Sequence, residues 1–206
     1  MLAFGRQDLH SKGYAEAVRA ARSRGFAAVE RLAGGRAAVF HEETIALAWA
    51  RAARDPWPGT HERFRELASI VERALVRIGV DARVGAIPGE YCPGEYSINA
   101  RGEKKLVGIG QRIIKGASHI GGVIVVAGTE RVRDVLISVY EALGLEWNPG
   151  TAGSVADEVD SATWDDVAEV VFGEWSRGRH VVEAELDAET LELAEQLEVE
   201  HTSPVG

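Results

Sequence analysis

The sequence predicts an α+β fold. Two observations favour this class: several strand-like segments are close enough in the chain to pair as hairpins, and the segments with helical periodicity are grouped separately from them. A regular alternation of strands and helices would instead indicate a doubly wound parallel sheet. The length of 206 residues suits one domain with a core of its own.

The first part of the chain is expected to form short strands around one helix. Met1–Gln7 is an apolar strand that runs into a turn, and residues 15–23 form an alanine-rich helix. Residues 26–32 and 37–40 are strand candidates on either side of a glycine pair, so they could form a hairpin. Residues 44–53 fit a strand or a helix.

The middle of the chain is predicted to be one helix followed by hairpin strands. After the turn sequence at 55–59, Thr60 caps a helix that extends to about Ile78, where apolar residues recur at helical spacing. Four strand candidates follow, and the second and third of them form a hairpin: residues 82–87, 96–100, 104–114 and 116–126.

The C-terminal part is predicted to be mainly helical. Residues 129–143 form an amphipathic helix that ends at a glycine. Thr163–Trp175 and Asp187–Leu197 are two more helices, and their first residues are suitable N-caps. A short strand is expected between them, at residues 180–186.

Composition limits the possible partners and location. The net charge of −9 argues against nucleic-acid binding. No apolar run reaches the roughly 18 residues that would indicate a membrane-spanning helix. The single cysteine, Cys92, excludes an intramolecular disulfide and fits a cytoplasmic protein. The charge is uneven, because residues 151–206 carry 15 acidic and two basic side chains, which we expect on solvated helix faces.

Two glycine-interrupted segments that carry cations are the strongest functional signal. Residues 31–41 read RLAGGRAAVFH, and residues 104–112 read KKLVGIGQR. Glycine lets the backbone approach a ligand closely, and consecutive amides at such a bend can bind an anion. A lysine beside these glycines is suited to a phosphate or an activated carboxylate.

These two segments resemble signatures of the lipoate–protein ligase A family, within the biotin/lipoate ligase superfamily. A weaker match lies at residues 151–158, and the similarity runs from about residue 2 to about residue 175. The resemblance implies a mixed, largely antiparallel sheet packed by helices, as in class II aminoacyl-tRNA synthetases and biotin ligases, and it favours a strand over a helix at residues 44–53. It implies one catalytic domain over 1–206, with 151–206 as a helical, acidic part and without the N-terminal helix and strand usual in the family.

The resemblance also implies roles for individual residues. Lys105 matches the catalytic lysine of the family, and an ammonium there would stabilise negative charge on carboxylate and phosphate oxygens in the transition state. The residues implied to bind ATP or the adenylate are Arg31, Gly34, Gly35, Arg36, Ala38, Val39 and Phe40. Those implied to line the acyl pocket are His41, Gly108, His119 and Gly121. The sequence does not identify the residues that would bind a metal.

The implied activity is ATP-dependent ligation of lipoate or octanoate, through an acyl-adenylate, to a lysine of a carrier protein. ATP, Mg²⁺ and lipoate are the implied cofactors, and lipoyl carrier domains or a glycine-cleavage H-like protein are the implied partners. Two alternatives stay open. One is octanoyl or lipoyl transfer without ATP, and the other is a non-catalytic relative that binds acyl groups or carriers.

The single cysteine bears on the choice between ligase and transferase. Related octanoyltransferases pass the acyl group through a cysteine thioester. In those relatives the cysteine follows the catalytic lysine, whereas Cys92 precedes Lys105 in this chain. We therefore expect that Cys92 is not a nucleophile. We also expect the two glycine segments to meet around one ligand, with the acidic C-terminal helices away from it.

Overall fold

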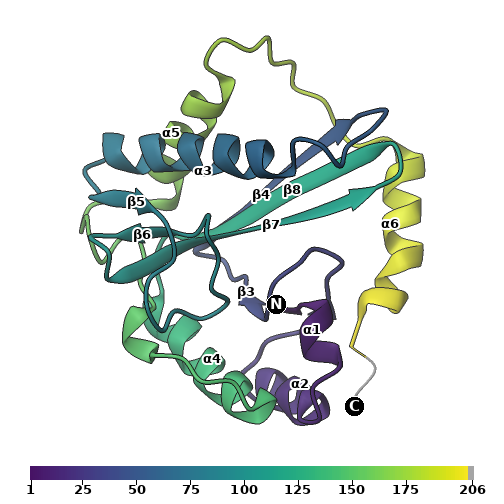
Figure 1. Ribbon diagram of the computed structural model, residues 1–206, viewed down its shortest axis with the longest axis vertical. Helices are drawn as coiled ribbons and strands as arrows, with labels where there is room; N and C mark the ends of the chain where they lie inside the picture. The colour runs from purple at the N-terminus through teal and green to yellow at the C-terminus, as the bar shows by residue number, and fades with distance from the viewer. Residues whose placement is uncertain (204–206) are drawn as a thin grey trace.

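Two sheets form the framework of the molecule (Figure 1). The smaller sheet has the order β2-β1-β3 and the larger has the order β4-β8-β7-β6-β5. The computed structural model describes residues 1–203. The strands are β1 (Leu2–Phe4), β2 (Ala28–Glu30), β3 (Ala38–Val39), β4 (Thr44–Ala52), β5 (Ala82–Val84), β6 (Ile98–Ala100), β7 (Lys104–Ile114) and β8 (Ala117–Val125).

Each sheet has its own helices and its own core. The smaller sheet packs with α2 (Tyr14–Ser23) and α4 (Thr129–Leu143) around Phe4 and Leu136, which are fully buried. The larger sheet packs with α3 (Thr60–Arg77) and α5 (Trp164–Ser176). Figure 1 shows α3 running across the larger sheet, with α2 and α4 on the far side of the smaller one. The remaining helices are α1 (Arg6–Leu9), α6 (Ala188–His201) and a 3₁₀ turn, Pro149–Thr151.

The predicted fold class is confirmed. All neighbouring strands of the larger sheet are antiparallel, and the pairing of β1 with β2 is parallel, so the fold mixes both kinds. The hairpin of β6 and β7 forms as predicted and turns at Arg101-Gly102, where both residues have positive φ. Residues 44–52 form a strand, which is the alternative that the family resemblance favoured.

The predicted hairpin across the glycine pair was wrong. β2 and β3 do not pair with each other, because β1 lies between them and pairs with both. All three residues of β1 are buried, so the strand has the character of a central strand. As a result, residues 31–37 are not a tight turn but a loop that passes over one end of the smaller sheet.

Two further local predictions were wrong. Residues 180–186 form no strand, and Val182 and Leu186 in this segment are exposed, so no sheet partner covers them. The N-cap of α3 is Gly59, in the left-handed conformation with φ 81°, and Thr60 is the first helical residue. The Thr60 hydroxyl donates to the carbonyl of Trp57 instead of capping the helix.

The C-terminal segment is attached to the edge of the smaller sheet. No residue of α6 is buried, but Ser203 just after it is 1% exposed, and its N–H donates to the carbonyl of Ala28. The Tyr14 hydroxyl lies 2.7 Å from Glu30 Oε1 and 2.8 Å from Ser203 Oγ. None of the helices within residues 1–203 is long and apolar enough to cross a membrane.

Candidate active site

A cavity of about 820 Å³ lies between the two sheets and is lined by residues from both. Side-chain alternation explains how the short strands line it. Leu2 and Val39 point into the core of the smaller sheet, whereas Ala3, Ala38 and Phe40 face the cavity. On the other wall, Gly108 of β7 leaves open space, because a Cβ there would meet only Lys105 Cε at 3.8 Å. Gly121 of β8 also lines the cavity, but a Cβ there would clash with the carbonyl oxygen of Leu47.

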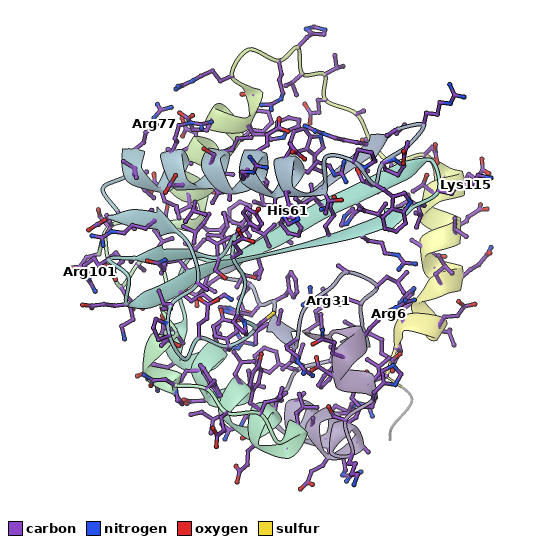
Figure 2. All side chains as sticks on the ribbon, viewed as in Figure 1. Arg6, Arg31, His61, Arg77, Arg101 and Lys115 are labelled. Carbon is purple, nitrogen blue, oxygen red and sulfur yellow. The ribbon has the colours of Figure 1, made fainter. Side chains whose placement is uncertain are left out.

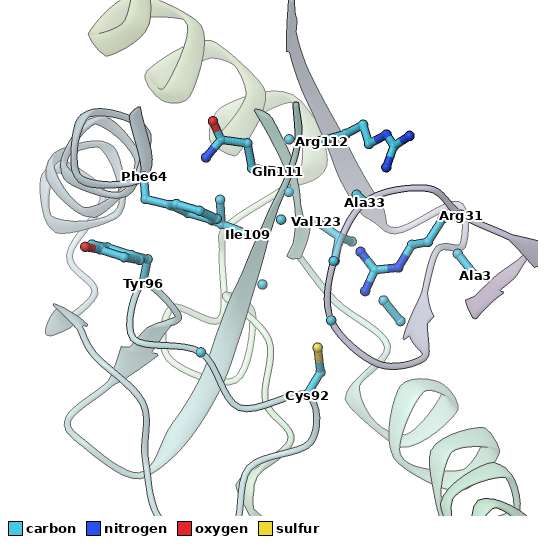
Figure 3. Close-up of a pocket in the computed structure, with 18 of the residues that line it drawn as sticks. Ala3, Arg31, Ala33, Phe64, Cys92, Tyr96, Ile109, Gln111, Arg112 and Val123 are labelled. Atoms are coloured by element: carbon cyan, nitrogen blue, oxygen red, sulfur yellow. The ribbon is translucent and has the colours of Figure 1, made fainter. Parts of the chain in front are cut away.

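The free edge of β7 borders this cavity. β6 pairs with β7 only from Lys104 to Val107, so beyond that point β7 has a neighbour on one side only, which is β8. The loop 31–36 reaches this edge, where the N–H of Gly34 lies 3.4 Å from the carbonyl oxygen of Gln111. The two glycine segments therefore meet in space, as predicted (Figure 3).

Lys105 is the most deeply buried cation in the cavity wall, at 1% exposure. Its Nζ atom lies 3.2 Å from Glu90 Oε1, 2.9 Å from the Tyr91 carbonyl oxygen and 2.7 Å from the Cys92 carbonyl oxygen. These three acceptors match the three N–H donors of an ammonium. Lys104 points the other way and donates to the carbonyl of Gly150, as expected for neighbours on a strand.

Cys92 lies in the same wall, with its thiol in the cavity. The N–H of Arg36 donates to its Sγ atom at 3.1 Å, and its own N–H donates to the Tyr140 hydroxyl at 2.9 Å. Its φ of 43° is in the left-handed region, which residues other than glycine adopt only when their surroundings hold them there. In Figure 3 the sulfur points into the space between the loop and β7.

The loop 31–36 is fixed by charged contacts. Arg31 Nη2 donates to the Arg36 carbonyl oxygen at 2.6 Å, and Arg36 Nη1 lies 3.2 Å from Asp8 Oδ1. Asp8 is fully buried, and burial raises the pKa of its carboxyl, while hydrogen bonds from Gly5 and Arg36 act in the opposite direction. The guanidinium of Arg36 therefore holds the loop to Asp8, and its backbone N–H binds the thiol of Cys92.

Two cavity-lining arginines have unused donors. Within residues 1–203, the Nε atoms of Arg31 and Arg112 are buried and have no hydrogen-bond partner. A buried N–H without a partner carries a free-energy cost, and an anionic ligand would remove it. Arg31 comes from the loop, and Figure 2 places it between the two sheets, whereas Arg77 and Arg101 lie on the outer surface.

Nine of the twelve predicted site residues line the cavity. They are Arg31, Gly34, Gly35, Ala38, Phe40, Lys105, Gly108, His119 and Gly121. Their roles remain predictions, because position alone does not establish chemistry.

Three predicted residues lie elsewhere. Val39 is 2% exposed in the core of the smaller sheet, on the face of the sheet opposite to that of Ala38 and Phe40. The side chain of Arg36 is turned towards Asp8. His41 packs against Gly128 at the start of α4, where a Cβ would lie 2.8 Å from its Cε1 atom. Burial, and secondarily the nearby Arg131, lower the pKa of this imidazole. His41 therefore does not line this cavity.

Several residues in and beside the cavity were not among the predicted site residues. Tyr91 lines the cavity and Glu90 pairs with Lys105, and both lie in a segment with no periodicity, so only its loop character was predicted. Phe64 and Tyr96 stack with ring centroids 5.0 Å apart and line the α3 side of the cavity. One feature of the sequence could have indicated this segment: an acid, an aromatic residue and the only cysteine are consecutive in a predicted loop. Loops often carry functional residues.

Comparisons with known proteins agree with this geometry. A sequence model of the lipoyl protein ligase A/B catalytic domain matches residues 2–174. Two curated octanoyl-[GcvH]:protein N-octanoyltransferases are similar: that of Geobacillus kaustophilus is 27% identical over 129 residues, and that of Exiguobacterium sp. is 24% identical over 145 residues. These alignments cover 63% and 70% of this chain but 45% and 51% of the relatives, so the chain spans about half the length of the curated relatives it matches.

Solved structures with the same fold include two with bound ligands. A putative lipoate protein ligase of Thermoplasma acidophilum with bound lipoic acid has a TM-score of 0.72 and 20% identity, over 95% of this chain and 76% of that one. A lipoate-protein ligase A bound with ATP has a TM-score of 0.73 and 18% identity, with the same coverage. At these identities the likeness shows the fold alone.

Proposed function

Because the chain belongs to the lipoyl protein ligase A/B catalytic domain family, we propose that it is an enzyme that transfers a medium-chain acyl group to a carrier-protein lysine. The acyl group is octanoyl or lipoyl, and the acceptor is a lipoyl carrier domain or a glycine-cleavage H-like protein. One observation carries the choice of mechanism: the Cys92 thiol stands in the cavity while the carbonyl of the same residue is hydrogen-bonded to Lys105.

The proposed mechanism passes through a thioester on Cys92. The thiolate attacks the acyl carbonyl carbon, the new S–C bond replaces the bond to the donor carrier, and the donor leaves with a proton. The lysine amine of the acceptor then attacks the thioester, an amide bond forms, and the thiol of Cys92 is regenerated. The protein supplies the nucleophile, the donor carrier supplies the acyl group, and the acceptor carrier supplies the lysine amine.

Two features of the cavity support this chemistry. The N–H of Arg36 donates to Sγ and holds the sulfur at the cavity, where an acyl carbonyl carbon can reach it. The ammonium of Lys105 can exchange its carbonyl acceptor on Cys92 for the acyl oxygen as negative charge develops there. Gly108, on the same strand as Lys105, leaves room for the acyl chain.

This proposal revises the expectation for Cys92. That expectation depended on the order of Cys92 and Lys105 in the chain, and order does not determine position in space. The segment between β5 and β6 folds back along β7, so the cysteine reaches the wall that Lys105 occupies. A cysteine that precedes the lysine in the sequence can therefore lie beside it in the structure.

ATP-dependent ligation is the second candidate, and a separate observation favours it. The unpartnered Nε atoms of Arg31 and Arg112 could bind a phosphate, and the loop at Gly34-Gly35 offers backbone N–H groups beside them. Bound ATP would activate the acid as an adenylate. Within the described residues, no group of three or more His, Cys, Asp or Glu side chains could hold a metal, so Mg²⁺ would depend mainly on phosphate oxygens.

A single set of reactions separates these candidates. The protein is incubated with an octanoylated carrier and an apo acceptor carrier, and separately with octanoate or lipoate, ATP, Mg²⁺ and the acceptor. We expect transfer in the first reaction without ATP, and an octanoyl adduct on Cys92 by intact-mass and peptide mass spectrometry.

The Cys92→Ser variant is the matched test of the thioester. It should lose both the adduct and the transfer. Transfer that requires ATP and survives in Cys92→Ser would establish the ligase instead. Binding of carrier or acid by calorimetry, with no transfer in either reaction, would indicate the non-catalytic alternative.

A further inference from the structure

The carboxylate of Glu90 joins the cysteine loop to the buried lysine. The side chain of Glu90 is fully buried, and it accepts four hydrogen bonds. Oε1 accepts from Gly94 N at 3.0 Å, Ser97 Oγ at 2.8 Å and Lys105 Nζ at 3.2 Å, and Oε2 accepts from Ile87 N at 3.2 Å. A buried carboxylate is stable only when its acceptors are filled and its charge is paired, and both conditions are met here.

These bonds enclose the segment that carries Cys92. The donors at Ile87, Gly94 and Ser97 lie on both sides of Cys92 in the sequence, so the chain between them curls around one carboxylate. Cys92 itself has φ 43°, a conformation that must be held by its surroundings. Glu90 provides the contacts on one side of the loop, and the Tyr140 hydroxyl and the Arg36 N–H provide those on the other.

The same carboxylate also pairs with the only buried ammonium of the cavity wall among residues 1–203. Lys105 has one charged partner, Glu90, and its two other acceptors are carbonyl oxygens of Tyr91 and Cys92. At 1% exposure, water cannot replace the missing charge if the carboxylate is removed. The contacts of Glu90 therefore hold both the loop that carries the thiol and the ammonium of Lys105 beside it.

We infer that Glu90 is a positioning residue for acyl transfer, which holds the Cys92 loop and the Lys105 ammonium as one unit and does not itself touch the substrate. The inference rests on the proposed function. It adds a residue whose role is to present the nucleophile and the cation together, at a fixed separation. Gly108, Arg31 and Arg112, which are proposed to contact the substrate, form no hydrogen bond with Glu90, so we expect substrate binding to change little without its charge.

The test uses the Glu90→Gln variant, which keeps the shape of the side chain but removes its charge and places an N–H₂ group opposite one of the four donors. We expect kcat for transfer to fall by about a hundredfold, as for loss of one preorganised electrostatic contact, while KM for the carriers changes less than about threefold. The rate of Cys92 alkylation by iodoacetamide at neutral pH should fall about tenfold in the folded protein.

Glu103→Gln is the matched control. Glu103 lies on the turn before β7 with its side chain 67% exposed, and its contact is an ion pair with Arg101 at 3.7 Å. This variant makes the same chemical change on the neighbouring hairpin and should leave kcat, KM and the alkylation rate unchanged. Equal alkylation rates and equal kcat in Glu90→Gln and Glu103→Gln would overturn the inference.

A double variant keeps the test decisive if Glu90→Gln alone folds poorly. Glu90→Gln with Lys105→Gln leaves no unpaired buried charge, so it should unfold at higher urea than Glu90→Gln. It should still show slow alkylation of Cys92, because the loop has lost its carboxylate. Alkylation at the wild-type rate in the double variant would contradict the inference. Alkylation needs no acyl substrate, so this outcome is independent of whether the thioester of the proposed function forms.

Discussion

The Nζ atom of Lys105 and the carbonyl oxygen of Cys92 are 2.7 Å apart and joined by a hydrogen bond. The residue with the strongest case as catalytic cation is thus bonded to the backbone of the residue with the strongest case as nucleophile. A substitution of Lys105 therefore removes a direct contact of the Cys92 backbone.

We predict that Lys105→Ala lowers acyl transfer by about 10²–10³-fold, the size typical for one preorganised charge contact. The variant also leaves Glu90 buried without its charged partner, which should reduce the free energy of unfolding by about 3–5 kcal/mol. Transfer is therefore measured per folded protein, with folding checked by urea titration. Lys104→Ala is the control, because Lys104 contacts only a carbonyl near the surface, and an equal loss in both variants would contradict the assignment.

The two glycines of the loop should differ in their tolerance of alanine. At Gly35, φ is 98° and a Cβ would lie 2.9 Å from Cys92 Sγ and from Arg31 Nη2, so Gly35→Ala should cost about 1–3 kcal/mol of stability and slow alkylation of Cys92. At Gly34 a Cβ would meet nothing within 4 Å, so Gly34→Ala should be nearly neutral. Urea unfolding and iodoacetamide kinetics measure both, and a costly Gly34→Ala would show that the loop has a different conformation.

His41 should affect acid stability and not acyl binding. Its pKa is lowered by burial, so the unfolded chain binds the proton more tightly, and stability is lost as pH falls below the ordinary value of 6.5. His41→Gln should remove this loss, so in urea titrations the free energy of unfolding of the wild type should decrease relative to that of the variant as pH falls below about 6.5. Octanoate affinity should be the same in both proteins, and a weaker affinity in His41→Gln would return this residue to the acyl pocket.

Tyr14→Phe should loosen the C-terminal attachment. The substitution removes the hydroxyl that bonds Glu30 and Ser203, while the ring keeps its edge-on contact with Phe4 at 5.1 Å between centroids. The loss should be about 1 kcal/mol, as for one or two hydrogen bonds that are partly replaced by water. Hydrogen exchange at the Ser203 amide, which bonds the Ala28 carbonyl, should become faster, whereas amides in β8 should exchange as before.

The sequence by itself determined the fold class, most helices and strands, and part of the site. Hydrophobic periodicity is a local property, so the 60–77 and 129–143 helices could be read from residues close in the chain. Strand alternation likewise predicts that Lys104 and Lys105 point in opposite directions, as the structure shows. The two glycine segments could be recognised together because each carries its own signature.

Only the tertiary structure decided which distant residues meet. β1 separates β2 from β3 because a central position buries Leu2–Phe4 on both sides, and no local pattern encodes that choice. Cys92 and Glu90 lie in a segment without periodicity, and their place beside Lys105 depends on hydrogen bonds to backbone groups around the loop. Such contacts depend on how the whole chain closes on itself, so chain order gave no guide to the position of the thiol.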